Sequence, residues 1–324
     1  ALAVTDALPE IEDLCFLEVP KVFSLKGSVV TPAMMLELSR AVQRVLIRPE
    51  VSGVVVTQPA DNIEETAYFV SISLSDVFQN QNSKPIVFTT CMNPEDPMFD
   101  GTKNLLDSIR VACHDVKGDI STVVVCMNGE IHAASRAQLT HTNKASALAS
   151  PGWGPVGYVD RDNVYFRCGA LELDTGLDFP MLKKLTAKVP VVKAMCGDDG
   201  ALLEMFLEKE PDAIIVEGFG RGNLPAGMMP AIKKAVKKGI FVVISTRASS
   251  GRVLDSTVFP GSVAQCLECG CLLAGETTTS KARLLLMYVL SQKEAIQLKK
   301  EDPERFFAYV QECLDPVLTN RLFG

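Results

Sequence analysis

The chain has 324 residues, of which 47% are apolar, and a formal net charge of −7. This apolar content is well above that of disordered chains and supports one large or two medium domains. The negative charge argues against a nucleic-acid partner. No apolar run approaches the roughly 18 residues of a membrane helix, so we expect no membrane partner. No export signal opens the chain, which favours the cytoplasm.

Cysteine usage also favours a reducing compartment. The ten cysteines are dispersed, and several lie in apolar runs, such as Cys126 at the end of V-V-V-C. This pattern is typical of reduced, buried thiols and not of a disulfide framework. The cluster Cys266-x-x-Cys269-x-Cys271 lacks a fourth zinc ligand nearby, so we interpret it as structural. We expect no metal.

Short β-branched runs alternate with helical patterns along the chain. In order, the strand candidates are Val54–Thr57, Pro85–Thr90, Thr122–Met127, Val189–Ala194, Ala213–Val216 and Gly239–Thr246. The helix candidates are Pro32–Leu46, Ile63–Leu74, Leu105–Cys113, Met228–Lys238, Lys281–Leu298 and a charged segment near Glu301–Cys313. Thr31 is the expected cap of the first helix, with Pro32 at its first position. Apolar strands separated by helices predict a parallel sheet covered on both faces.

The pattern changes near residues 168–188. Residues 171–178 read L-E-L-D-T-G-L-D and are rich in turn formers, and a new strand–helix series starts at Val189. We therefore predict an N-terminal α/β domain over residues 1–170, a linker over 171–188 and a smaller α/β domain over 189–324.

The segment after the first predicted strand is the strongest candidate for a site. Val54–Thr57 runs into a short polar turn, and a helix then begins with Glu64 and Glu65 in its first turn. Open α/β proteins bind ligands beyond the carboxyl end of a strand, beside a helix amino terminus. The two glutamates also suit capping of the helix alone. Asp61 lies at the exit of the strand, where site residues concentrate.

Residues 57–68 read T-Q-P-A-D-N-I-E-E-T-A-Y and resemble the H-G-T-D-T-x-E-E-T-A-Y loop of the bacterial L-asparaginase and glutaminase family. Similar matches follow in order, at T-T-C-M-N-P (89–94), D-G-T-K-N-L (100–105) and N-G-E-I-H-A-A (128–134). T-H-T (140–142) and the region A-S-P-G-W-G-P-V-G (149–157) continue the series. The resemblance extends from about Leu8 to Met287. It implies a larger flavodoxin-like N-terminal domain with a parallel or mixed sheet, and a smaller C-terminal α/β domain. It also implies a homodimer or homotetramer with sites between subunits.

The resemblance also implies site residues. Asp61 corresponds to the family's catalytic aspartate, which with the lysine activates a nucleophile and which also holds the ligand ammonium. Ser28 or the backbone of Gly27 corresponds to the group that holds the ligand carboxylate. Cys91 takes an alanine position beside the pocket, where a thiol would need a base to act as a substitute nucleophile. Asn223, in the loop E-G-F-G-R-G-N-L-P, corresponds to an asparagine that completes a neighbouring subunit's site. This loop departs from G-x-G-x-x-G, so we expect no dinucleotide and no other cofactor.

At two positions, this sequence has an apolar residue where the family has a catalytic side chain. Ala60 stands where the family has a catalytic threonine, and Leu139 where it has the lysine that precedes T-H-T. Lys144 lies five residues further on. An alanine methyl group neither attacks a carbonyl nor transfers a proton.

The family opens with a strand and a turn that carries its first nucleophilic threonine, and this sequence has no counterpart after Ala1. Loss of that central strand would expose two sheet edges. We expect an N-terminal piece that precedes Ala1, with the C-terminal segment 316–323 as the alternative filler.

Three functional hypotheses follow. The first is a protein that binds a small amino-acid-like ligand but hydrolyses L-asparagine poorly. The second is a diverged amidohydrolase that uses a threonine N-terminal to Ala1, or Cys91. The third is an oligomeric scaffold without a ligand.

Overall fold

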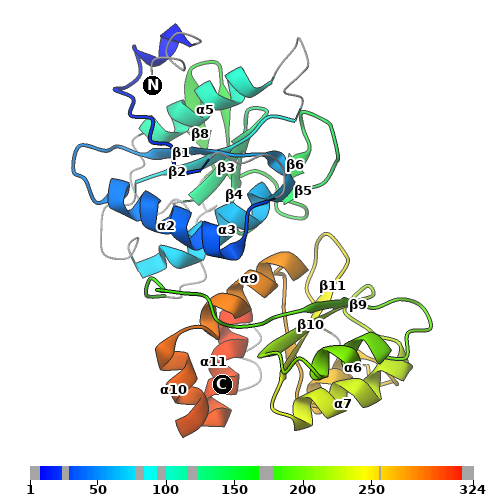
Figure 1. The fold of residues 1–324 in the computed structure, drawn as a ribbon. Coiled ribbons are helices and arrows are strands. Elements are labelled where there is room, and N and C mark those ends of the chain that lie inside the picture. Colours follow the sequence, from blue (N-terminus) through cyan, green and yellow to red (C-terminus); the bar gives the residue numbers. More distant parts are fainter. Residues whose placement is uncertain are drawn as a thin grey trace. The chain divides into compact units, whose positions relative to one another are not determined.

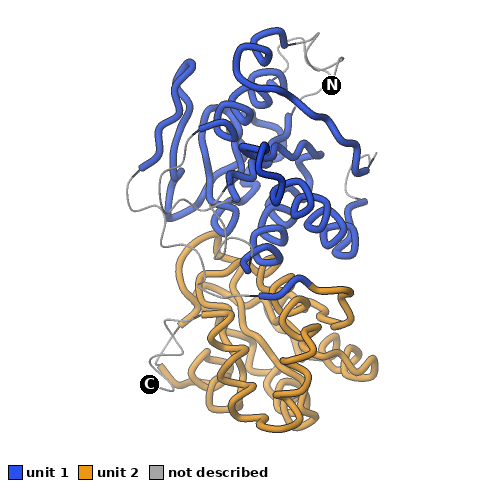
Figure 2. The backbone as a smooth tube through the Cα atoms, turned by 90° about the vertical axis from the view of Figure 1, so that its left-hand side faces the viewer, with its two compact units in different colours: residues 1–181 blue, residues 182–324 orange. Residues whose placement is uncertain are grey.

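The computed structural model describes residues 8–23, 29–76, 84–92, 100–114, 123–167, 179–254 and 257–315. Contacts divide the chain into two compact units, residues 1–181 (unit 1) and 182–324 (unit 2), which are coloured separately in Figure 2. The division falls between Met181 and Leu182, inside the range 171–188. No helix within the described ranges is long and apolar enough to cross a membrane.

Unit 1 contains a six-stranded mixed sheet in the order β1-β2-β3-β4-β7-β8 (Figure 1). Its strands are β1 (Val54–Thr57), β2 (Ile86–Thr89), β3 (Val123–Met127), β4 (Glu130–Ala133), β7 (Gly157–Asp160) and β8 (Asn163–Phe166). A two-stranded ribbon pairs β5 (Gln138–Leu139) with β6 (Leu148–Ala149). The described helices of this unit are η1 (Pro9–Ile11), α2 (Pro32–Leu46), η2 (Ala60–Asn62), α3 (Ile63–Ser73) and α5 (Gly101–Cys113).

The sheet is mixed, as the predicted parallel or mixed fold class allows: β1–β3, the strands expected from the sequence pattern, are parallel. β4, β7 and β8 pair antiparallel, because the chain reverses directly after β3. Asn128 and Gly129 make that turn with φ values of 52° and 77°. Asn-Gly is the preferred pair for a two-residue hairpin turn, since both positions need positive φ. The sequence therefore carried a hairpin signal within the N-G-E-I motif.

Both faces of the parallel half are covered, because successive side chains of a strand point to opposite sides. Phe88 of β2 and Val125 of β3 pack with the buried residues of α2 and α3. Their neighbours Val87 and Val124 pack on the other face with Val111 of α5. In Figure 1, α2 and α3 lie on one side of the sheet and α5 on the other. Thr31 Oγ1 accepts a hydrogen bond from the amide of Met34, which confirms the predicted cap of α2.

Unit 2 contains a four-stranded sheet in the order β12-β11-β10-β9, and all its pairs are parallel. Its strands are β9 (Val191–Lys193), β10 (Ala213–Gly218), β11 (Phe241–Thr246) and β12 (Leu272–Leu273). Its helices are α6 (Ala201–Leu207), η3 (Ala226–Met228), α7 (Met229–Lys237), α8 (Val263–Glu268), α9 (Thr279–Val289), α10 (Lys293–Glu301) and α11 (Pro303–Leu314). The larger mixed sheet and the smaller parallel sheet confirm the predicted fold class.

The expected single helix over residues 281–298 is wrong, because the chain forms two helices, α9 and α10. Between them, Gln292 adopts an extended conformation with φ −72° and ψ 139°. The buried Ser291 hydroxyl accepts hydrogen bonds from the amides of Thr186 and Ala187, at 2.9 and 3.1 Å. A contact more than 100 residues away in sequence thus accompanies the break, and periodicity in a local window does not contain it.

Candidate functional site

The carboxyl ends of β1, β2 and β3 meet at one edge of the unit 1 sheet. The parallel register pairs Thr57 with Thr89 and Phe88 with Val125. Beyond the register, the amide of Gln58 donates to the carbonyl of Thr89 at 3.3 Å. The turns that follow the strands therefore start side by side, at the place where open α/β sheets bind ligands.

Ala60 and Asp61 lie in η2, directly between β1 and α3. Ala60 is half-buried and Asp61 is exposed. The side-chain Nε2 of Gln58 donates to Asn62 Oδ1 at 3.4 Å and to Thr66 Oγ1 at 3.3 Å, and these bonds join the turn to α3. Within the described ranges, the Asp61 carboxylate makes no hydrogen bond or ion pair. It is thus available to an ammonium group.

Leu139 lies at the same edge. Its backbone amide donates to a carboxylate oxygen of Glu64, in the first turn of α3. This bond joins the β5–β6 ribbon to the turn that carries Ala60 and Asp61, across 75 residues of sequence. Glu64 therefore has a structural role beyond capping, which sequence spacing did not indicate. The Leu139 side chain is half-buried and offers no proton donor or acceptor.

Cys91 follows β2 by two residues and is half-buried. Burial, and then the Asp100 carboxylate, raise the pKa of its thiol above the ordinary value. A raised pKa keeps the thiol protonated at neutral pH, and the thiolate is the reactive form. This environment weighs against Cys91 as a nucleophile.

Asn104, from the D-G-T-K-N-L segment, is buried and joins two strand ends. Its Nδ2 donates to the carbonyl of Thr90 at 2.9 Å, and its Oδ1 accepts from the amide of Asn128 at 2.9 Å. The positions of the turns after β2 and β3 are thus coupled through one side chain.

Asn223 lies in unit 2, in the glycine-rich loop after β10. Its Oδ1 accepts a hydrogen bond from the amide of Val263, the first residue of α8, at 3.1 Å. The loop is closed by a bond between the Phe219 amide and the Asn223 carbonyl, at 2.8 Å. Gly222 has φ 107°, and a Cβ there would lie 2.6 Å from Val253 Cγ1. Close packing accounts for this glycine.

Beside this loop, polar side chains from the ends of β9, β10 and β11 and from the first residue of α9 form a chain of contacts. Thr279 Oγ1 donates to Glu217 Oε2 at 2.7 Å, and the Ser245 hydroxyl lies 2.9 Å from Thr279 Oγ1. Lys193 Nζ lies 2.9 Å from Glu217 Oε1. We call these four residues the Glu217 network.

A buried histidine lies on β4 of unit 1. His132 Nδ1 is 2.9 Å from Ser150 Oγ, and Nε2 is 3.3 Å from Glu130 Oε2. Burial lowers the pKa of His132, and the Glu130 carboxylate opposes that effect. His132 is therefore a core residue, whereas His141 lies in an exposed loop.

Two of the predicted site residues, Gly27 and Ser28, lie outside the described residues. The described cysteines are free thiols, and Cys266 and Cys271 are buried. No group of three or more metal-ligating side chains occurs within the described part of the chain.

Comparisons with known proteins agree with this architecture. Residues 2–170 match the family profile "Asparaginase, N-terminal", and residues 188–301 match "Glutaminase/Asparaginase C-terminal domain". The chain is 30% identical over 300 residues to L-asparaginase of Bacillus licheniformis, covering 90% of this chain and 89% of that protein. It is 27% identical over 308 residues to glutaminase-asparaginase of Pseudomonas fluorescens biotype A, covering 93% of this chain and 80% of that protein.

A solved structure shares the fold. The crystal structure of a probable cytoplasmic L-asparaginase from Campylobacter jejuni has a TM-score of 0.81 and 26% sequence identity, and covers 95% of this chain and 92% of that one. With two family profiles matched in order over both units, the chain belongs to the asparaginase/glutaminase family.

Proposed function

We propose that this protein binds a small ligand of the asparagine, aspartate or glutamine class at the carboxyl edge of the unit 1 sheet. The single observation that carries the proposal is the Asp61 carboxylate, exposed and without a hydrogen bond or ion pair among the described residues, beside the amino terminus of α3. In the proposal, Asp61 holds the ligand ammonium and Ser28, or the backbone of Gly27, holds its carboxylate. Cys91 and Ala60 line the pocket, and Asn223 from a second copy of the chain completes it.

We further propose that hydrolysis of L-asparagine is impaired. Ala60 and Leu139 lie on segments joined through Glu64, so the two replacements affect one place. Neither side chain supplies a nucleophile or a proton acceptor. Loss of one member of a catalytic set typically lowers the rate by several orders of magnitude.

A homodimer or homotetramer in the cytoplasm fits this proposal. The dispersed free thiols are typical of a reducing compartment. A shared site also requires more than one copy of the chain.

Purified protein tests the proposal directly. Ammonia release is measured with L-asparagine and with L-glutamine, and L-aspartate is titrated by calorimetry. We expect saturable heat without appreciable turnover, and Asp61→Asn abolishes the heat. Asp160→Asn is the matched control, because Asp160 is an exposed carboxylate at the end of β7. Turnover at ordinary enzyme rates would contradict the impaired chemistry, and absence of both signals would favour a scaffold.

Family membership favours a diverged amidohydrolase as the second candidate function. The raised pKa of the Cys91 thiol weighs against it as the nucleophile in that case. Turnover that persists in Cys91→Ala would exclude the thiol.

A further inference from the structure

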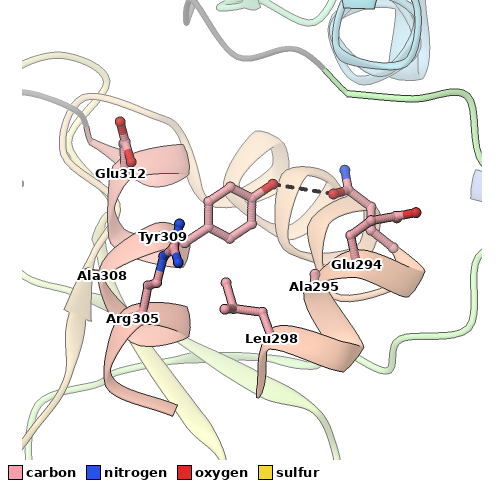
Figure 3. Close-up of a pocket in the computed structure, with 8 residues that line it drawn as sticks. Glu294, Ala295, Leu298, Arg305, Ala308, Tyr309 and Glu312 are labelled. Atoms are coloured by element: carbon pink, nitrogen blue, oxygen red, sulfur yellow. Dashed lines mark hydrogen bonds between the residues drawn. The ribbon is translucent and has the colours of Figure 1, made fainter. Parts of the chain in front are cut away.

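A cavity of about 420 Å³ lies between α10 and α11 of unit 2 (Figure 3). The charged side chains that line it do not gather at one place. Glu294 and Glu312 lie on opposite sides of Tyr309, and Arg305 lies on the side of Glu312. This arrangement favours neither an anionic nor a cationic ligand, so the cavity is assigned none.

In unit 1, two cysteines lie where the N-terminal segment packs on α5. Ile11 of η1 and Ile109 of α5 are buried in the same apolar cluster, and Cys15 packs against that cluster. Cys15 follows Ile11 by four residues, and its amide donates to the Ile11 carbonyl at 3.0 Å. Cys113 follows Ile109 by four residues and ends α5. Since helical residues four apart share a face, Cys113 lies on the face of α5 that meets the N-terminal segment.

The two thiols contact each other. A side-chain hydrogen bond joins Cys15 and Cys113. Both are free thiols, Cys113 exposed and Cys15 half-buried, so a small oxidant can reach the pair. Thiols in contact need little backbone movement to form a disulfide, in which the Cβ atoms lie about 3.5–4.5 Å apart.

The surroundings of the pair determine how readily it reacts. Burial, and then the Cys15 thiol, raise the pKa of the Cys113 thiol above the ordinary value. Because the thiolate is the reactive form, oxidation is slow at neutral pH and accelerates in mild base. Cys266 and Cys271 of unit 2 also share a thiol hydrogen bond, but both are buried and shielded from an oxidant.

We propose that Cys15 and Cys113 form a reversible disulfide when the protein meets a hydroperoxide, and that this link fixes residues 8–23 on α5. With hydrogen peroxide, one thiolate attacks an oxygen, the O–O bond breaks, and a sulfenic acid and one water form. The second thiol attacks the sulfenic sulfur, the S–S bond forms and a second water leaves. The two thiols lose two electrons and two protons, and the peroxide is reduced to two waters.

The link connects the N-terminal segment to the helix that orders the unit 1 edge. Asn104, in the first turn of α5, joins the turns after β2 and β3, and Cys113 ends the same helix. A cross-link between residues about 100 positions apart also restricts the unfolded chain, which stabilises the folded state. The oxidised protein is therefore the more stable form.

Peptide mass spectrometry of the whole chain after oxidation tests the proposal. Reduced protein is treated with a small molar excess of hydrogen peroxide under native conditions, and the remaining thiols are blocked with N-ethylmaleimide. We expect a peptide cross-linked between Cys15 and Cys113 as the main disulfide, reversed by dithiothreitol and formed faster as the pH rises from about 7 to about 9. The oxidised protein should unfold at a temperature higher by about 5 °C or more.

Cys15→Ser and Cys113→Ser should each abolish the cross-link and the temperature shift. Cys196→Ser is the matched control, because Cys196 is an exposed cysteine of unit 2, and its loss leaves both unchanged. Asp61→Asn also leaves the cross-link unchanged, which separates this proposal from the proposed function. A different cysteine pair as the main product, oxidation of Cys113 to a sulfinic acid without a cross-link, or a temperature shift that persists in Cys15→Ser would overturn it.

Discussion

The parallel strands β1–β3 of unit 1 and the parallel sheet of unit 2 each end in an edge of strand carboxyl ends, but the side chains at the two edges differ in how they are paired. In unit 2, contacts run from Lys193 to Glu217, from Glu217 to Thr279 and from Thr279 to Ser245, and the Asn223 side-chain oxygen accepts a hydrogen bond from the first residue of α8. In unit 1, the Asp61 carboxylate has no partner among the described residues, half-buried Ala60 precedes it in η2, and half-buried Cys91 follows the neighbouring strand β2. A satisfied edge stabilises its own unit, whereas an unsatisfied edge has groups left for a ligand.

At the unit 1 edge, the hydrogen bonds that hold the strand ends together are present, but the reactive groups of the family are absent. The unit 1 edge keeps its scaffold, since Gln58, Asn104 and Glu64 still join the strand ends and the ribbon. The hydroxyl and amine that the family pattern places there are missing at Ala60 and Leu139. The following predictions test the unit 1 and unit 2 edges, in order of decreasing expected effect.

The largest effect is expected from restoring the missing groups. The double variant Ala60→Thr with Leu139→Lys should raise ammonia release from L-asparagine by about a hundredfold, equivalent to roughly 2.7 kcal/mol, because a hydroxyl and a base return to a retained scaffold. Leu139→Lys alone is the control and should stay near the parent rate. An unchanged rate in the double variant would mean that the scaffold itself has lost catalytic geometry.

Substitution of a closely packed glycine in the loop after β10 of unit 2 should destabilise the protein. Gly222→Ala should lower the free energy of unfolding by about 2 kcal/mol, because the new methyl meets Val253 in a residue with φ 107°. Gly220→Ala is the matched control: its φ is 47°, but no atom lies within 4 Å of the added Cβ. Denaturant unfolding compares the two, and equal losses would show that backbone conformation, not packing, dominates in this loop.

Disrupting the Glu217 network should lower the free energy of unfolding by somewhat less than Gly222→Ala does. Glu217→Ala leaves Thr279 and Lys193 without their acceptor and should lower the free energy of unfolding by about 1.5 kcal/mol. Glu204→Ala removes the exposed pair with Lys234 and should change stability by under about 0.5 kcal/mol. A loss in Glu217→Ala no greater than in Glu204→Ala would remove the contrast between the two edges.

The smallest expected effect is the contribution of His132 to the pH dependence of stability. Burial lowers the pKa of His132 in the folded state, so the unfolded chain binds its proton more readily. The stability is therefore intact above the ordinary histidine pKa of about 6.5 and falls as the pH drops below it. Denaturant unfolding between neutral and mildly acidic pH should show a smaller decline in His132→Gln than in His141→Gln, where the exposed ring is removed.

Local pattern predicted much of the secondary structure. The helix Pro32–Leu46 was predicted to the residue, with Thr31 as its cap, and the expected parallel strands lie within one or two residues of their observed bounds. These features depend on periodicity and capping within a short window. The order of motifs likewise indicated the family and both sheets.

Other features required the tertiary structure. The break between α9 and α10 coincides with Ser291 bonded to residues 186 and 187, and the ribbon carrying Leu139 is placed by Glu64. The bonded state of the Glu217 network and the cavity between α10 and α11 also depend on side chains from separate elements.

The amino-acid sequence by itself determined the family, the two α/β units and the chemical groups at the unit 1 edge. The tertiary structure decided which groups at each edge are bonded within the protein: the Glu217 network of unit 2 is paired, and the Asp61 carboxylate has no partner among the described residues. The physical reason is that periodicity is a property of neighbouring residues, whereas hydrogen bonding and burial depend on residues brought together by folding.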